Sequence, residues 1–178
     1  MSLLPLHLYG SPVLRQQSAE VKAVDDEVRE FVSDLFETMH ASKGIGLAAN
    51  QVGVPQRVAV VEVEGDRVVL INPEILQTEG RESAEEGCLS VPDVYADVSR
   101  PGGIVVEATD EQGNRYRREV SGLLARAIQH EIDHLDGILF LDHLGALKRR
   151  MLITRYRKEH RDDPGYIKEI EKAPTPTD

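Results

Sequence analysis

The amino-acid sequence predicts an α+β fold: antiparallel strands pack around a central helix, with an N-terminal helix before them and a C-terminal helix after them. Pairs of β-branched runs are separated by short polar segments, which is typical of hairpins. The regular strand–helix alternation of a parallel α/β sheet is missing. The segment expected to form the central helix contains the string HEIDH, residues 130–134.

The first long helix is expected over residues 25–41. Asp25 is a candidate N-cap, because an aspartate there can accept a hydrogen bond from the first helical turn. Apolar residues recur at helical spacing and should face the core: Val28, Phe31, Val32, Leu35, Phe36 and Met39. The helix should end near Ser42, because the glycine-rich segment 44–55 that follows is typical of an irregular loop.

Two hairpins are expected after this loop. Residues 57–63 and 67–73 are β-branched runs separated by the turn sequence EGD. Residues 103–110 and 114–120 flank EQG in the same way.

The central helix is expected over residues 121–137, with Ser121 as its N-cap and Gly137 as its stop. Helical periodicity places nine residues on one inward side: Leu123, Leu124, Ala127, Ile128, His130, Glu131, Ile132, His134 and Leu135. Four polar residues share the other side: Arg126, Gln129, Asp133 and Asp136. The core should therefore be built around this helix.

A third helix is expected within residues 145–163, and the closing residues 172–178 have the composition of a frayed tail. We expect one catalytic domain over residues 1–165 and a partly disordered tail over residues 166–178. A length of 178 residues fits one domain.

Composition limits the classes of function. The formal net charge of −10 argues against a broad nucleic-acid-binding face. No apolar run is long enough to cross a bilayer and no signal peptide is recognisable, so we expect a cytoplasmic protein without a membrane partner. The single cysteine, Cys88, cannot form an internal disulfide, so it must pack, react or bind a metal.

The string HEIDH indicates a metal hydrolase, because His130 and His134 lie one helical turn apart and Glu131 is beside them. A catalytic site needs a third ligand, for which Cys88 and Glu159 are candidates. Cys88 is favoured, because thiolate is a strong ligand for zinc or iron, whereas Glu159 lies among basic residues. An extended metzincin site is excluded, because Phe140 occupies the position of its third histidine. The simpler interpretation is a helix with paired histidines and an inert thiol.

Three segments, GIGLAANQ (44–51), EGCLS (86–90) and QHEIDH (129–134), together resemble the signature motifs of peptide deformylases. The resemblance implies a divalent metal, Fe(II) in the cell with Zn, Ni or Co as substitutes, bound by Cys88, His130 and His134. It also implies that the substrates are nascent chains beginning with N-formylmethionine, in a bacterium or an organelle. The similarity extends from the first helix to about residue 150.

The resemblance also assigns roles. Glu131 would carry the proton, while the Gln51 side chain and the Leu89 backbone N–H would stabilise the oxyanion. Substrate would contact Gly44, Ile45, Gly46, Glu86 and Gly87. Leu123 and Ala127 are candidates for the pocket of the first side chain, with ordinary core packing as the alternative. Some relatives have an apolar residue at Arg126 and an arginine at Tyr95, so the motifs do not define the pocket rim.

Two other functions compete with a deformylase. One is a small HExxH zinc endopeptidase that uses Glu159, and the other is a structural metal or peptide-binding module; neither explains the 44–51 motif. Residues 148–161 are strongly basic and form either a solvated helix face or a contact with ribosomal RNA: Lys148, Arg149, Arg150, Arg155, Arg157, Lys158 and Arg161.

Overall fold

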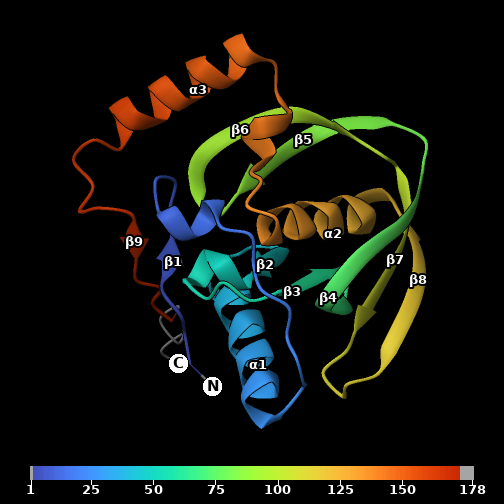
Figure 1. The fold of residues 1–178 in the computed structure, drawn as a ribbon. Helices are drawn as coiled ribbons and strands as arrows, with labels where there is room; N and C mark the ends of the chain where they lie inside the picture. Colours follow the sequence, from blue (N-terminus) through green and yellow to red (C-terminus); the bar gives the residue numbers. More distant parts are fainter. Residues whose placement is uncertain (1, 173–178) are drawn as a thin grey trace, which may run out of the picture.

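The computed structural model describes residues 2–172 and confirms the predicted α+β class (Figure 1). Its described strands form a five-stranded antiparallel sheet in the order β2-β3-β4-β7-β8 and two separate pairs, β5-β6 and β1-β9. The strands are β1 (Leu6–His7), β2 (Gly46–Ala48), β3 (Val58–Val63), β4 (Asp66–Glu79), β5 (Glu82–Cys88), β6 (Val91–Arg100), β7 (Gly103–Thr109), β8 (Arg115–Ser121) and β9 (Ile167–Lys168). The α-helices are α1 (Asp26–Ala41), α2 (Gly122–Leu135) and α3 (Ala146–Glu159).

Helix α1 forms where the sequence predicts it. The Asp25 carboxylate accepts a hydrogen bond from the Val28 N–H at 3.0 Å, and Ser42 is the C-cap. Its buried apolar side chains pack on one face of the large sheet, against residues such as Val58 and Val60 of β3.

The predicted loop 44–55 is wrong in part, because it contains strand β2 and the 3₁₀ helix Ala49–Val52. Strand β2 forms by pairing with β3, Ala48 opposite Ala59, a partner that local sequence does not reveal. Gly53 ends the 3₁₀ turn with a φ of 87°, a conformation that favours glycine.

Both predicted hairpins, β3–β4 and β7–β8, are confirmed, and β4 continues to Glu79 to pair with β7. No strand is predicted for residues 82–100, which form a third hairpin, β5–β6. In β6 alternate residues are buried, ending at Arg100.

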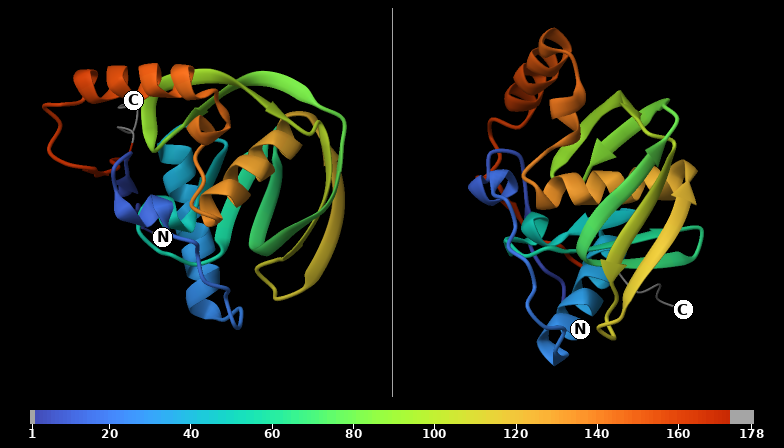
Figure 2. Two further views of the ribbon diagram at one scale, coloured as in Figure 1. Left: turned by 45° about the horizontal axis from the view of Figure 1, so that its top comes forward. Right: turned by 45° about the vertical axis from the view of Figure 1, so that its right-hand side comes forward.

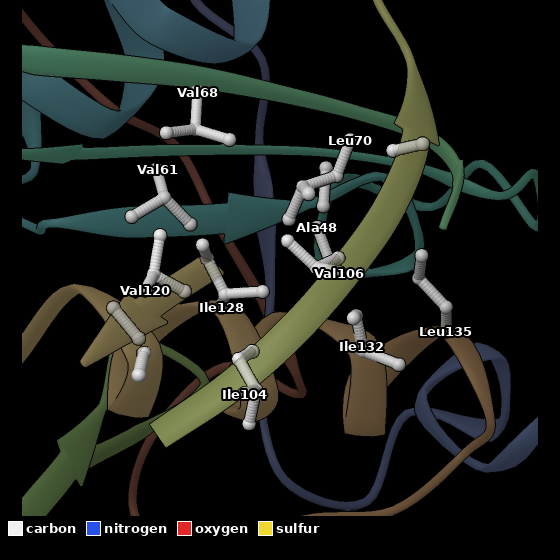
Figure 3. Packing of buried hydrophobic residues seen from close by; sticks show 14 residues of the cluster. Ala48, Val61, Val68, Leu70, Ile104, Val106, Val120, Ile128, Ile132 and Leu135 are labelled. Atoms are coloured by element: carbon white, nitrogen blue, oxygen red, sulfur yellow. The ribbon is translucent and has the colours of Figure 1, made fainter. Parts of the chain in front are cut away.

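Helix α2 is the centre of the molecule and lies between the large sheet and the β5–β6 hairpin (Figures 1 and 2). Its apolar side chains Ile128, Ile132 and Leu135 pack against sheet residues that include Leu70 and Val106 (Figure 3). Strand β3 contributes side chains to the core on both faces of the large sheet: Ala59 and Val61 face α2, while Val58 and Val60 face α1.

Two details of the predicted helix are corrected. Among the described residues, the Ser121 side chain accepts no capping hydrogen bond, although Gly137 does follow the helix with a φ of 75°. The predicted polar side is not solvent-facing throughout, because the β5–β6 hairpin covers Arg126 and Gln129, which are 8% and 6% exposed. Leu123, predicted to face inward, is 54% exposed.

Helix α3 forms as predicted and packs over β6 through the buried Tyr156, near Phe140. The predicted tail, 166–178, includes strand β9, which pairs with β1 through Leu6 and Lys168; residues 173–178 lie outside the described residues. None of the helices in the described part of the chain is long and apolar enough to cross a membrane.

Candidate active site

Three potential metal ligands converge on one point, two from α2 and one from the end of β5. The Nε2 atoms of His130 and His134 are 3.1 Å apart, and the Cys88 Sγ lies 3.3 Å from His134 Nε2. The three candidate ligand atoms lie within 4.8 Å of one another. The helical spacing therefore brings the two histidines together, and the hairpin places the thiol beside them.

This set of donors fits a divalent transition metal. Two imidazole nitrogens and one thiolate leave an open fourth position, as in catalytic sites. Metal–ligand distances of about 2.1 Å to nitrogen and 2.3 Å to sulfur require tetrahedral ligands to lie roughly 3.4–3.6 Å apart. The observed separations of 3.1 and 3.3 Å need only a small expansion. Glu159 lies apart from this cluster, exposed on α3 and 3.8 Å from Arg155.

On the side of its ring away from the cluster, His130 contacts the buried carboxylate of Glu86. Its Nδ1 lies 3.0 Å from Oε1 of Glu86, so a proton on Nδ1 leaves the Nε2 lone pair facing the cluster. Burial alone would raise the pKa of Glu86, but hydrogen bonds from His130 and Arg100 lower this pKa to about 2. Glu86 is therefore ionised and orients the ring.

The Glu86 carboxylate has two further partners. Oε2 accepts hydrogen bonds from Arg100 Nε and Arg126 Nη1, each at 2.6 Å, and Oε1 accepts one from Arg100 Nη2 at 3.0 Å. The family resemblance predicts that Glu86 contacts the substrate. Here the residue borders the cleft, but its carboxylate is occupied by His130 and two guanidinium groups.

Glu131 lies beside the ligands and is only 4% exposed. Within residues 2–172 its Oε2 has no hydrogen-bond partner. Burial raises the pKa of Glu131 to about 7, despite the opposing positive charges of His130 and Arg100. Such a carboxyl can exchange a proton near neutral pH. A Cβ on Gly46 would meet Glu131 Oε1 at 2.6 Å, so the glycine permits this approach.

Gln51 is fixed with its amide N–H group towards the cluster. Its Oε1 accepts a hydrogen bond from the Ala48 N–H at 2.9 Å, which leaves Nε2 to donate. Nε2 lies 3.1 Å from Ser90 Oγ and 3.7 Å from Cys88 Sγ. The 3₁₀ helix thus holds a hydrogen-bond donor next to the candidate metal ligands.

A cleft of about 690 Å³ opens over these residues. Its lining includes twelve residues predicted for the site: Gly44, Ile45, Gly46, Gln51, Glu86, Gly87, Cys88, Leu89, Leu123, Ala127, His130 and Glu131. His134 lies beneath them, fully buried. Tyr95 and residues 168–171 also border the cleft, and the latter are not among the residues predicted for the site.

Comparison with known proteins identifies the family. A family model described as polypeptide deformylase matches residues 3–150. The chain belongs to the polypeptide deformylase family. It is 48% identical over 164 residues to a peptide deformylase of Rhizobium meliloti, covering 89% of this chain and 94% of the relative. It is also 48% identical over 167 residues to that of Agrobacterium fabrum, covering 90% and 98%.

Solved structures of similar proteins support the same family assignment. A peptide deformylase from Ehrlichia chaffeensis in complex with actinonin has a TM-score of 0.86 at 40% identity, covering 90% of this chain and 99% of that one. The chain is therefore a deformylase, and the endopeptidase alternative is not supported. Deformylases are metalloenzymes, and the Cys/His/His cluster can bind a metal ion.

Two residues of this deformylase site, Arg100 and Asn50, are not predicted from the sequence. Arg100 follows the buried positions of β6, and an arginine in that register signals a buried anion, but the strand itself was not recognised. Asn50 donates to the His134 carbonyl at 2.5 Å and so joins the 3₁₀ helix to the end of α2. No local sequence signal distinguishes Asn50 from a loop residue.

Proposed function

We propose that Cys88, His130 and His134 hold one divalent metal ion, and that this deformylase removes the formyl group of N-formylmethionyl nascent chains as formate. The observation that carries the proposal is the convergence of these three ligand atoms beside the buried carboxyl of Glu131. The bound ion would supply Lewis acidity and lower the pKa of a water molecule towards 7.

We assign Fe(II) as the metal in the cell, with Zn, Ni or Co as substitutes. One thiolate and two imidazoles suit these borderline metals better than Mg²⁺ or Ca²⁺, which prefer oxygen ligands. A thiolate ligand together with Fe(II) also implies sensitivity to oxygen.

Glu131 would act first as a base and then as an acid. It takes a proton from the attacking water and passes that proton to the nitrogen of the departing peptide. Its pKa of about 7 suits both directions of transfer at neutral pH. Breaking the formyl C–N bond gives formate and a free amino terminus.

Gln51 and Leu89 would stabilise the negative charge that develops on the formyl oxygen. The Gln51 Nε2 donor is already oriented by the Ala48 N–H and faces the cluster, so little rearrangement is needed. The backbone N–H of Leu89, the residue after Cys88, would be the second donor.

The peptide would lie along the cleft, with its backbone beside Gly44, Ile45 and Gly46 and near Gly87. Leu123 and Ala127 border the same cleft, which supports a role in holding the first side chain. The 54% exposure of Leu123 is not what core packing predicts.

The basic segment 148–161 would bring the enzyme to emerging chains by contacting ribosomal RNA, which would place it in the cytoplasm. Most of its cationic side chains are exposed, on α3 or just after it. Such contacts release counterions, so binding should weaken steeply with salt. Binding to ribosomes that is independent of salt would contradict this contact.

The function is tested by anaerobic purification, loading with Fe(II) and measurement of formate release from formyl-Met-Ala-Ser, with and without a chelator. An unformylated peptide serves as the control for cleavage of the backbone. Chelator-sensitive formate release without backbone cleavage is expected. Backbone cleavage, or formate release that survives removal of the metal, would contradict the proposal.

A further inference from the structure

Arg126 is a buried arginine whose hydrogen bonds go to the β5–β6 hairpin rather than to the cleft. Its Nη1 donates to Glu86 Oε2 at 2.6 Å and to the Val98 carbonyl at 2.8 Å, and its Nη2 donates to the Glu82 carbonyl at 2.9 Å. Only 10% of its side chain is exposed. The guanidinium group therefore connects α2 to both strands of the hairpin, although Arg126 also borders the cleft.

The position of this connection matters because the candidate ligands come from two elements. Cys88 is on the hairpin, whereas His130 and His134 are on α2. Their mutual distances depend on how the hairpin sits on the helix. Other polar contacts support the same interface: Arg100 to Asp133 at 2.8 Å, His130 Nδ1 to Glu86 Oε1 at 3.0 Å, and Gln129 Nε2 to the carbonyl of Pro101, the residue after β6, at 3.0 Å. Arg126 adds a hydrogen bond to Glu86, the carboxylate that contacts His130.

We propose that Arg126 is a positioning residue for the metal site, an inference that rests on the proposed Cys88, His130 and His134 ligand set. Together with Arg100 it fixes Oε2 of Glu86, which turns Oε1 towards His130 Nδ1 and keeps the Nε2 lone pair facing the ion. Through the Val98 and Glu82 carbonyls it also holds the Cys88-bearing hairpin against the helix that carries the histidines.

Substitution of Arg126 should disturb the ligand set without removing a ligand. Arg126→Leu leaves Glu86 with Arg100 and His130, but it leaves two backbone carbonyls in a buried interface without this donor. Arg126→Lys keeps the charge, but a single ammonium group does not reproduce the planar arrangement of donors. Metal affinity should therefore fall in the order wild type, Lys variant, Leu variant.

The test measures Co(II) affinity of the full chain by anaerobic competition with a chelator, and follows the thiolate-to-Co(II) charge-transfer band. Arg126→Leu should weaken Co(II) binding on the order of 10–100-fold, the usual effect of losing an outer partner of a metal ligand. Arg118→Leu is the matched control, because Arg118 pairs with Asp66 at 2.8 Å on the far strand β8, away from the ligands. It should bind Co(II) as the wild type does.

Equal Co(II) affinity of wild type and Arg126→Leu would overturn the proposal, and so would an equal loss in Arg118→Leu. If Arg126→Leu does not fold when metal-free, as judged by circular dichroism, Arg126→Lys decides: an intermediate affinity supports the proposal, and wild-type affinity overturns it. Formate release and Co(II) binding by the wild type test the proposed function separately. A failure of the Arg126 inference therefore leaves that function standing.

Discussion

At the scale of single residues, the site depends on the different surroundings of two carboxyl groups, those of Glu86 and Glu131. Glu86 is buried among two arginines and His130, which lower its pKa to about 2 and fix it as an anion. Glu131 is buried beside Gly46, and its Oε2 has no hydrogen-bond partner within residues 2–172; burial raises its pKa to about 7. One carboxylate is thus suited to orienting a ligand and the other to moving a proton.

Glu131→Gln should retain the metal and lose most turnover. The amide keeps the size of the side chain but cannot accept a proton, so kcat should fall by roughly 10²–10⁴-fold. Metal content by elemental analysis and formate release should be measured on the same preparation. A variant with near wild-type kcat would remove Glu131 from the proposed mechanism.

Gly46→Ala should impair catalysis more than stability. The added Cβ would lie 2.6 Å from Glu131 Oε1, so the carboxylate must move, and a displacement of about 1 Å can cost on the order of 10²-fold in rate. Gly145→Ala is the control, because a Cβ there meets nothing within 4 Å. Similar kcat values for the two variants would show that the close contact between Gly46 and Glu131 does not affect catalysis.

At the scale of elements, the α-helices can be predicted from the sequence and the β5–β6 hairpin cannot. Local signals such as the Asp25 cap, the apolar spacing of α1 and the histidine spacing of α2 lie within one element, and each predicted its structure correctly. Strand β2 and the β5–β6 hairpin depend on partners elsewhere in the chain. The motifs therefore suggest the candidate ligands, whereas the contacts of Arg100 and Arg126 with Glu86 can be seen only in the three-dimensional structure.

The connection after α2 gives a prediction about pH. Burial opposes ionisation of Asp142, but hydrogen bonds from Arg15 and the Leu139 N–H lower its pKa below 3.8. Its contribution to the free energy of unfolding is therefore complete above pH 3.8 and is lost as the pH falls through the lower folded-state value.

Asp142→Asn should destabilise the fold at neutral pH, on the order of 1 kcal/mol for a partly exposed ion pair. Urea unfolding of both proteins from pH 7 to pH 3 measures the difference. That difference should shrink only at the acidic end. A constant difference over the whole range would show that ionisation of Asp142 does not contribute to stability.

At the scale of the whole molecule, α2 connects the large sheet to the β5–β6 hairpin. One side of α2 packs on the large sheet through Ile128 and Ile132. The other side is covered by the β5–β6 hairpin (Figure 2), whose Val98 carbonyl accepts a hydrogen bond from Arg126. The three proposed ligands lie where helix and hairpin meet. A metal bound by both elements should therefore stabilise the fold as a whole.

Addition of Zn(II) or Co(II) should raise the free energy of unfolding. A ligand that binds only the folded state adds about 2.7 kcal/mol at a free concentration one hundred times its Kd. Thermal unfolding with metal and with chelator measures this effect, and His134→Ala should abolish most of it. Equal transition temperatures with and without metal would contradict a site shared by helix and hairpin.

The most direct test of the central claim is Cys88→Ala, assayed anaerobically for metal content and for formate release from formyl-Met-Ala-Ser. Loss of both is expected, because the thiolate is the one proposed ligand that comes from the hairpin. A Cys88→Ala protein that retains its metal and releases formate at the wild-type rate would contradict the ligand set and the mechanism built on it.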